Sequence, residues 1–374
     1  MGETSARLHG EEEHDATGYV RSRGGIGIRN RVLVLPSVIC SHVVADRIAA
    51  TVDRAVSTPH DHGCAQIGDD KDQTARTFAG LASNPNVSGA VVVGLGCETL
   101  QSEGVAAEVQ ARDVPVEETS IQAAGGTEAC FEDGVAAAAR LAATSSGSRA
   151  RIDLSELTLG VVGSDLHRSS LERADPLVGS LVETVVEAGG RVVVAGIDRV
   201  IPHVDSVSKC TSGDEAAARL QQLSDQHHTP WATPVQHSAQ NLDYQDISRL
   251  WADLPIEDVI AYGDTARQDS GVALVEASSS FAEATTALAA AGSQIVIHVT
   301  ADGIPAGHPI VPVVKVTGSE DTYAALEGDL DIHGGSTSSE EAERLLTAFL
   351  GGAPTCAEQH GVTAFGIART GPSM

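Results

Sequence analysis

Short apolar runs alternate with longer amphipathic segments along most of the chain. Residues 31–39, RVLVLPSVI, and residues 90–95 are almost continuously apolar, which is typical of strands buried on both faces of a parallel sheet. Residues 43–56 instead place apolar side chains at helical spacing. An alternation of these two patterns predicts an α/β fold.

The same alternation continues to the end of the sequence. In the first part we expect strands at residues 31–39, 90–95 and 114–117, and helices at 43–56, 73–82, 102–111 and 128–143. In the second part we expect strands at 157–162, 191–195, 272–276, 294–299 and 311–316, and helices at 176–188, 215–224, 281–291 and 340–350, the last of which closes the chain. The repeated cadence predicts two doubly wound, Rossmann-like α/β domains.

Composition places the boundaries of these domains. Residues 1–24 are polar and acidic and are expected to be flexible, so the first domain covers residues 25–146. Small and polar residues at 144–151, TSSGSRAR, predict a linker, and the second domain covers residues 151–374. Within it, residues 201–264 give no clear pattern apart from the helix at 215–224.

The charge of the chain is strongly acidic. The formal net charge is -27, and the only lysines are Lys71, Lys209 and Lys315. Such a surface repels nucleic acids and anionic membranes, so neither is an expected partner. High acidity with few lysines favours a protein from a salt-rich cytosol over an ordinary acidic protein, because molar salt screens the self-repulsion. No apolar run is long enough to span a membrane and no secretory signal is evident, so we expect a cytoplasmic protein.

Six cysteines are spread along the chain without a CxxC pair, which argues against a structural zinc site. Cys130, Cys210 and Cys356 are interpreted as reduced, mostly buried thiols. Cys40, Cys64 and Cys97 differ, since each follows a strand or lies beside a glycine. They are candidates for a reactive site.

Candidate chemistry concentrates between residues 59 and 98. His60, His62 and Cys64 alternate in one loop, and the strand at 90–95 ends at Cys97 and Glu98. Ligands bind outside the carboxyl ends of strands in open α/β sheets, so this end is well placed for chemistry. The histidines and Cys64 could bind a transition metal, and Glu98 could be a base or a ligand. The alternative for the two histidines is that they pair with nearby aspartates. The alternative for Cys97 and Glu98 is that they form only a turn after the strand.

A second candidate lies at residues 122–127, where Gln122 and two glycines precede a predicted helix. The free backbone NH groups of Gly126 and Thr127 at this helix N-terminus would hold a carboxylate. The alternative is that Thr127 is only an N-cap.

Several of these motifs resemble the altronate and galactarate dehydratase family, which also contains the large subunit of sulfolactate sulfo-lyase. The resemblance rests on HGCAQ at 62–66, ARTFAGLASNPNV at 75–87, VVVGLGCE at 91–98, GIGIRNRVLVLPSVICS at 25–41, SIQAAGGT at 120–127, GSD at 163–165, ADPLVGSLVETVVEAGG at 174–190, TADGIPAGHPIVPVVKV at 300–316 and GDLDIHGG at 328–335.

The chain departs from the family pattern between about residues 197 and 270. IDRVIPHVD at 197–205 replaces an acidic segment, and HHTPWATPVQHSAQNLDYQ at 227–245 replaces a glycine-rich segment that bears a lysine. The replacement is bulkier and less cationic. It predicts a preference for a small hydroxy-acid or an unusual sugar acid over altronate and galactarate, unless this stretch is a surface loop.

The resemblance implies a hydro-lyase acting on a sugar acid or small hydroxy-acid. It also implies an Fe(II) or Mn(II) ion as cofactor. As partners it implies a separate small subunit with a SAF domain, and whether the chain also forms a homo-oligomer is left open. The alternatives are a sulfo-lyase and a non-catalytic paralogue, and a nucleotide-binding protein is disfavoured because no GxGxxG motif opens a helix after the first strand. The implied site residues are His62 and Glu98 for catalysis, His62, Cys64 and Cys97 for the metal, and Arg29, Asn30, Ser41, Gln122, Gly126, Thr127, Ser164, Asp165 and Lys315 for the substrate.

Overall fold

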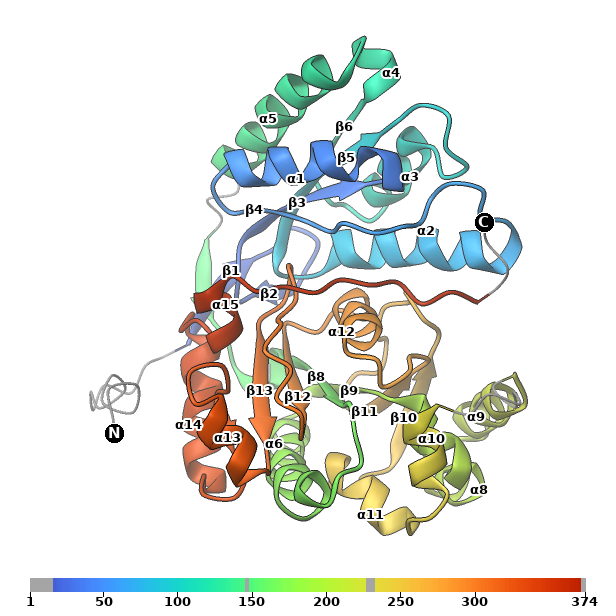
Figure 1. Cartoon of the computed structure of the whole chain (residues 1–374), viewed down its shortest axis with the longest axis vertical. Coiled ribbons are helices and arrows are strands. Elements are labelled where there is room, and N and C mark those ends of the chain that lie inside the picture. Colours follow the sequence, from blue (N-terminus) through green and yellow to red (C-terminus); the bar gives the residue numbers. More distant parts are fainter. Residues whose placement is uncertain (1–15, 145–147, 227–232, 371–374) are drawn as a thin grey trace.

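The computed structural model describes residues 16–144, 148–226 and 233–370. In these residues the chain forms two parallel sheets flanked by helices, together with a small antiparallel sheet (Figure 1). The predicted α/β class is confirmed. No helix in this part of the chain is long and apolar enough to cross a membrane.

The first sheet has four parallel strands in the order β4-β3-β5-β6. One face packs on α1 and α5, and the other packs on α2 and α3. The bounds are β3 (Arg31–Pro36), α1 (His42–Thr51), β4 (Ala55–Ser57), α2 (Gly68–Ser83), β5 (Val87–Gly94), α3 (Ser102–Gln110), β6 (Val116–Ser120), α4 (Ile121–Ala124) and α5 (Thr127–Thr144).

The second sheet has seven parallel strands in the order β10-β11-β9-β8-β12-β13-β14. Helices α6 and α14 cover one face and α12 covers the other. The main bounds are β8 (Thr158–Gly163), α6 (Asp175–Glu187), β9 (Arg191–Ala195), α9 (Asp214–Gln226), β10 (Ile256–Ile260), β11 (Gly271–Val275), α12 (Phe281–Ala290), β12 (Ile295–Val299), β13 (Val313–Thr317), β14 (Ile332–His333), α14 (Ser339–Leu350) and α15 (Cys356–His360). Shorter helices are α7 (Ile197–Val200), α8 (Val204–Val207), α10 (Pro234–Ala239), α11 (Tyr244–Ser248) and α13 (Glu320–Ala325).

The small antiparallel sheet corrects two expectations. Strand β1 (Thr17–Val20) lies in the stretch expected to be flexible, and it pairs with β2 (Ile26–Gly27) and with β7 (Arg149–Arg151). The expected flexibility is therefore wrong for residues 17–20, while residues 1–15 lie outside the described part. Strand β7 lies in the expected linker, so the connection between the domains is itself paired.

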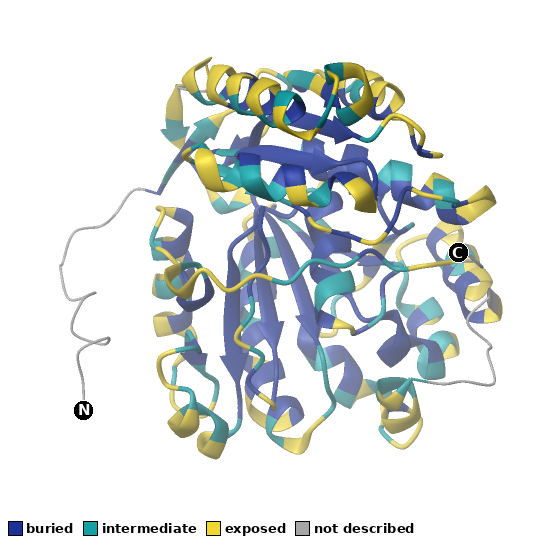
Figure 2. Ribbon diagram, turned by 45° about the horizontal axis from the view of Figure 1, so that its top comes forward, coloured by how far each residue is buried: buried dark blue, intermediate teal, exposed yellow. Residues whose placement is uncertain are grey.

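Helices α2 and α12 form the layer between the two sheets. One continuous apolar cluster contains residues of the first sheet, both helices and the second sheet, for example Leu33, Phe78 and Val162. Polar contacts reinforce it, because the Asn84 side chain donates to the carbonyls of Ala289 and Ser293, at 2.7 and 2.9 Å. Figure 2 shows the strands of both sheets as buried, with exposed residues on the outward faces of the helices.

The predicted strands and helices are otherwise found close to their expected positions, with three differences. The helix predicted at 43–56 ends at Thr51, and the missed strand β4 follows Arg54, whose φ is 63°. Strand β10 lies in the stretch without a clear pattern. Helix α15 follows α14, so the helix at 340–350 does not close the chain.

Each sheet contains a pair of neighbouring strands whose onward connections run to opposite sides of the sheet. In the first sheet these strands are β3 and β5, and in the second they are β8 and β12. A crevice forms outside the carboxyl ends of the strands at such a point, where open α/β sheets bind ligands. We call these two places the first edge and the second edge.

Candidate functional site

The first edge is built around Glu98, which is 3% exposed. Its carboxylate accepts hydrogen bonds from the Ser37 hydroxyl at 2.9 Å and from the backbone NH groups of Leu95 and Gly96 at 3.2 and 2.6 Å. Burial acts to raise the pKa of Glu98, but these hydrogen bonds outweigh it and hold the pKa below its ordinary value. Glu98 is therefore ionised at neutral pH and is a weak proton acceptor.

Two buried histidines lie in the loop beside Glu98. The His60 Nε2–H donates to the Pro36 carbonyl at 2.7 Å, and burial lowers the pKa of His60 to about 4. The His62 Nε2–H donates to the Ile367 carbonyl at 3.0 Å, while Nδ1 lies 3.0 Å from the Gln66 amide nitrogen. Burial also lowers the pKa of His62. Both rings are neutral at neutral pH.

Only a glycine fits between His62 and Cys64. Gly63 has a φ of 92°, and a Cβ there would lie 2.0 Å from the Ser37 carbonyl oxygen. The close approach lets the Gly63 carbonyl accept hydrogen bonds from the NH groups of Thr99 and Leu100, at 3.1 and 3.3 Å. The HGC and GLGCE motifs are thereby joined into one structure.

The last described segment, residues 363–370, supports this loop. It runs between α2 and α12 (Figure 1), with the Gln73 amide donating to the Ala368 carbonyl and Thr370 NH donating to Asp70. Tyr262 receives a hydrogen bond from Ala368 NH at 3.2 Å. Nothing in the sequence pattern marked this segment, because its role depends on contacts with residues far away in the chain.

Several predicted residues at the first edge are accessible. Cys40, Cys64 and Cys97 are exposed free thiols, and Gln122 and Thr127 are exposed at the start of α4 and α5. Gln122 lies against Gly96, since a Cβ on that glycine would be 2.8 Å from the Gln122 side-chain oxygen. The predicted carboxylate contacts of Gln122, Gly126 and Thr127 stay predictions. Ser41, in contrast, is fully buried and donates to the carbonyls of Val38 and Val93.

The donor set predicted for a metal does not form a site in this arrangement. Both ring nitrogens of His62 have hydrogen-bond partners, whereas Cys64 and Cys97 are exposed. In the part of the chain that the structure describes, no three His, Cys, Asp or Glu side chains converge to hold an ion. The described residues of this chain therefore do not by themselves bring together a complete set of metal ligands, and no step of the chemistry below depends on a metal. The predicted metal roles of His62, Cys64 and Cys97 stay predictions.

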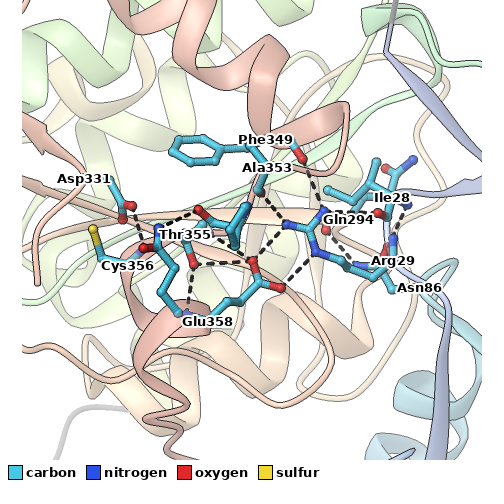
Figure 3. Close-up of polar contacts among 12 residues, drawn as sticks. Ile28, Arg29, Asn86, Gln294, Asp331, Phe349, Ala353, Thr355, Cys356 and Glu358 are labelled. Atoms are coloured by element: carbon cyan, nitrogen blue, oxygen red, sulfur yellow. Dashed lines mark hydrogen bonds and ion pairs between the residues drawn. The ribbon is translucent and has the colours of Figure 1, made fainter. Parts of the chain in front are cut away.

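Arg29 and Asn30 do not belong to the first edge, because they precede β3 and lie at its amino end. Arg29 forms an ion pair with Glu358 through two hydrogen bonds of 2.8 Å and donates to the carbonyls of Phe349 and Ala353 (Figure 3). The Asn30 side chain accepts from Arg21 at 2.8 Å. Both side chains therefore anchor other parts of the chain, Arg29 the helix α15 and Asn30 the segment before β3. The predicted substrate contacts of Arg29 and Asn30 stay predictions.

The second edge contains Ser164, Asp165 and Lys315, so the structure does not join them to the first-edge residues in one pocket. Asp165 is used locally, accepting from the NH groups of His167 and Ala301 at 2.9 and 2.6 Å. Ser164 follows β8 and its hydroxyl contacts Nε2 of His298 on β12. The other ring nitrogen of His298 lies 3.1 Å from the Lys315 ammonium nitrogen on β13.

Burial sets the charges at the second edge. His298 and Lys315 are both 0% exposed, and Phe281 of α12 packs on both, with the Lys315 nitrogen 3.7 Å from its ring centroid. Burial lowers the pKa of Lys315 to about 7, against the opposing effect of Asp331. Burial, together with the nearby Lys315 charge, lowers the pKa of His298 well below its ordinary value.

His298 was missed by sequence reasoning, although a signal was present. A histidine in the apolar strand QIVIHV and a lysine in the apolar strand VPVVKV are two titratable residues in buried strands that follow one another. Titratable groups in such positions have perturbed pKa values and cluster at functional sites. The register His298 opposite Lys315 then follows from the parallel pairing of β12 with β13.

Two segments of the chain match models of known protein families. Residues 18–146 match the second domain of D-galactarate dehydratase/altronate hydrolase, and residues 251–373 match the C-terminal part of D-galactarate/altronate dehydratase. The chain belongs to this family. The stretch between the two matches contains most of the sequence expected to diverge from the family pattern.

Relatives in the family include proteins with different named activities. The chain is 26% identical to the altronate dehydratase of Bacillus subtilis, over 91% of this chain and 73% of the relative. It is 26% identical to the (2R)-sulfolactate sulfo-lyase subunit beta of Chromohalobacter salexigens, over 84% and 85%. It is 25% identical to the altronate dehydratase of Escherichia coli, over 95% and 78%. These identities support a lyase family without selecting one substrate.

The Arg29–Glu358 ion pair gives a stability prediction. Replacing Arg29 with Met leaves Glu358, whose side chain is only 16% exposed, without its main partner, so we expect the free energy of unfolding at pH 7 to fall by about 3 kcal/mol. Arg47→Met is the matched control, since its partner Glu128 is exposed and we expect a loss below about 1 kcal/mol. Urea unfolding in molar KCl measures both. Equal losses in the two variants would contradict the assignment.

The difference in the free energy of unfolding between wild type and Arg29→Met should depend on pH, because Glu358 is titratable. Burial raises its pKa, but the hydrogen bonds and charge of Arg29 dominate and hold the pKa below its ordinary value. The contribution of the pair is therefore complete above the ordinary glutamate pKa, and it is lost as pH falls through the folded-state pKa. The stability gap between wild type and Arg29→Met should shrink in acid.

Proposed function

We propose that this protein is a hydro-lyase that removes water from a sugar acid or small hydroxy-acid. The observation that supports this most directly is membership of a dehydratase family through both matched segments, residues 18–146 and 251–373. Each segment also contributes polar, buried, titratable side chains to the carboxyl edge of its own parallel sheet, where α/β proteins bind ligands. An elimination needs a base for the proton next to the carboxylate and a water-poor crevice.

We propose in addition that the chain works with a separate small subunit carrying a SAF domain. The first edge supports this, because three of its neighbouring side chains are large, apolar and exposed: Ile39 at 37%, Val43 at 56% and Ile67 at 70%. In the sequence, Ile39 is next to Cys40 and Ile67 is three residues after Cys64, and both cysteines are exposed. A partner that covers this surface would remove apolar area from water and enclose the loops that carry Cys97 and Gln122.

A sulfo-lyase is the second candidate function. The observation that favours it is the sulfolactate relative, which matches this chain over 85% of its own length and is named as one subunit of a larger enzyme. The two reactions share the carboxylate and the proton to be removed and differ in the leaving group, sulfite in place of water.

The net charge of the protein and its free cysteines indicate the salt concentration and the redox conditions in which it would act. The net charge of -27 with three lysines supports a protein adapted to high salt, and the six free cysteines, none of them in a disulfide among the described residues, support action in a reducing cytoplasm.

The first test of this proposal is a substrate panel. The chain is assayed with its small partner in molar KCl against altronate, galactarate, other sugar acids, small hydroxy-acids and sulfolactate. We expect the highest kcat/KM for a small hydroxy-acid or an unusual sugar acid, because the bulky stretch at residues 227–245, only partly described, replaces a lysine-bearing segment. A preference for altronate or galactarate would refute the specificity argument, and the absence of any elimination would refute the lyase.

The second test concerns the predicted metal. A transition metal, Fe(II) or Mn(II), is proposed for the two-chain complex, with ligands that this chain alone does not bring together. Elemental analysis after anaerobic purification should therefore give less than about 0.1 equivalent for the isolated chain and near one equivalent for the complex. A metal-free complex that turns over substrate would rule the ion out.

A further inference from the structure

The second edge contains a continuous hydrogen-bonded chain of three titratable or exchangeable groups. The Ser164 hydroxyl contacts His298 Nε2, and His298 Nδ1 lies 3.1 Å from Lys315 Nζ. His298 and Lys315 are fully buried, whereas Ser164 is partly exposed, so Ser164 is the one member of the three that reaches the crevice. Ser164 directly follows β8, His298 lies in β12 and Lys315 lies in β13, and these three strands are neighbours in the sheet.

The hydrogen-bonded chain of Ser164, His298 and Lys315 lies at a position in the fold where α/β proteins bind ligands. Strands β8 and β12 are adjacent but connect onward to opposite sides of the sheet, and Ser164 follows β8 at this point, which is where open α/β sheets bind ligands. Asp165 holds the two loops that border the crevice together, because it accepts from Ala301 NH at 2.6 Å and from the Ser170 hydroxyl at 2.8 Å. The backbone that carries the Ser164 hydroxyl is thus held in a fixed position.

We propose that Ser164, His298 and Lys315 form a proton relay that removes the proton next to the carboxylate of a hydroxy-acid bound at the second edge. This inference rests on the proposed function and locates its base. The first edge is less suited to this role, since Glu98 is held as a hydrogen-bonded anion and both ring nitrogens of His62 are engaged. An effective general base has a pKa near the working pH, which Lys315 satisfies.

The protonation state of Lys315 sets the direction of the relay. A charged ammonium only donates, so His298 Nδ1 must accept and its Nε2–H points at Ser164. A neutral Lys315 can accept from Nδ1–H, which leaves Nε2 free to take the hydroxyl proton of Ser164. The groups facing Lys315 that affect this balance are His298 on β12, Asp331 before β14 and the Phe281 ring on α12.

The proposed step balances in protons and electrons. The substrate C–H bond breaks and its proton goes to Ser164 Oγ, as the Ser164 proton passes to His298 Nε2 and the Nδ1 proton passes to Lys315. The C–H electron pair forms the new carbon–carbon double bond, and the bond to the leaving hydroxyl breaks. That hydroxide takes a proton from solvent, and Lys315 later releases its own proton through Ser164.

The activity test compares buried and exposed positions of the same residue type. Lys315→Met and Ser164→Ala should lower kcat about 10²- to 10⁴-fold, the usual range for loss of general-base catalysis. The controls Lys209→Met and Ser155→Ala are at exposed positions and should leave kcat unchanged. Ser164→Thr keeps the hydroxyl and should restore most of the activity.

In wild type kcat/KM should rise with pH through about 7 and then level off, and this rise should be absent in Lys315→Met.

A second readout does not require turnover. With ¹⁵N-labelled histidine, the His298 signals, assigned by their loss in His298→Gln, should report a proton on Nε2 at low pH and movement of that proton to Nδ1 as pH rises through about 7. The change should be absent in Lys315→Met. A His298 tautomer that is constant between pH 5 and 9, or variants that keep the wild-type kcat and pH profile, would overturn the relay. Wild-type protein inactive on every acid would instead refute the proposed function, and the ¹⁵N result would still decide the relay.

Discussion

The Arg29–Glu358 ion pair is the contact on which the geometry of the first edge depends. It joins Arg29, two residues before β3, to α15, and Arg31 adds a second contact to the same carboxylate at 3.2 Å. The chain leaves α15 to form the segment at residues 363–370, whose Ile367 carbonyl holds the His62 ring. Glu358 also closes the capping box of α15 with Thr355. A chain end more than 300 residues away in sequence is thereby fixed against the first domain.

Burial gives the two edges opposite chemical characters. At the first edge, hydrogen bonds stabilise the charge of Glu98, while burial keeps His60 and His62 neutral. The groups there are committed to holding loops in shape, and the exposed thiols and apolar side chains suit contact with a partner. At the second edge, burial weakens the charge of Lys315 without removing its path to the crevice. A proton can therefore be exchanged there near neutral pH.

Sequence reasoning found most of the fold because buried parallel strands have a strong local signature. The runs around Val32 and Val91 are apolar throughout, and each was recognised without knowledge of its neighbours. Strand β4 was missed because three half-buried residues after a helix give no such run. Segment 363–370 was missed for a different reason, since its place is fixed by contacts with Tyr262 and α2.

The positions of the candidate residues in space were harder to predict than the fold, because a motif does not reveal which edge of a sheet it reaches. Arg29 precedes β3 and the HGC loop lies beyond the other end of that strand, and the charge of Arg29 is paired with Glu358. Ser164 and Lys315 were grouped with first-edge residues, although they belong to another sheet. His298, which joins them, is visible only once the register of β12 and β13 is known.

The central claim is that the substrate is bound and deprotonated at the second edge. The most direct measurement is a crystal structure of the complex with a bound hydroxy-acid, or with an unreactive analogue of it. The account predicts a hydroxy-acid carbon that bears the removable proton close to Ser164 Oγ, with polar atoms of the acid within about 3 Å of that hydroxyl. An acid bound at the first edge, against Gln122 and the N-terminus of α5, with the crevice beside Ser164 empty, would contradict it.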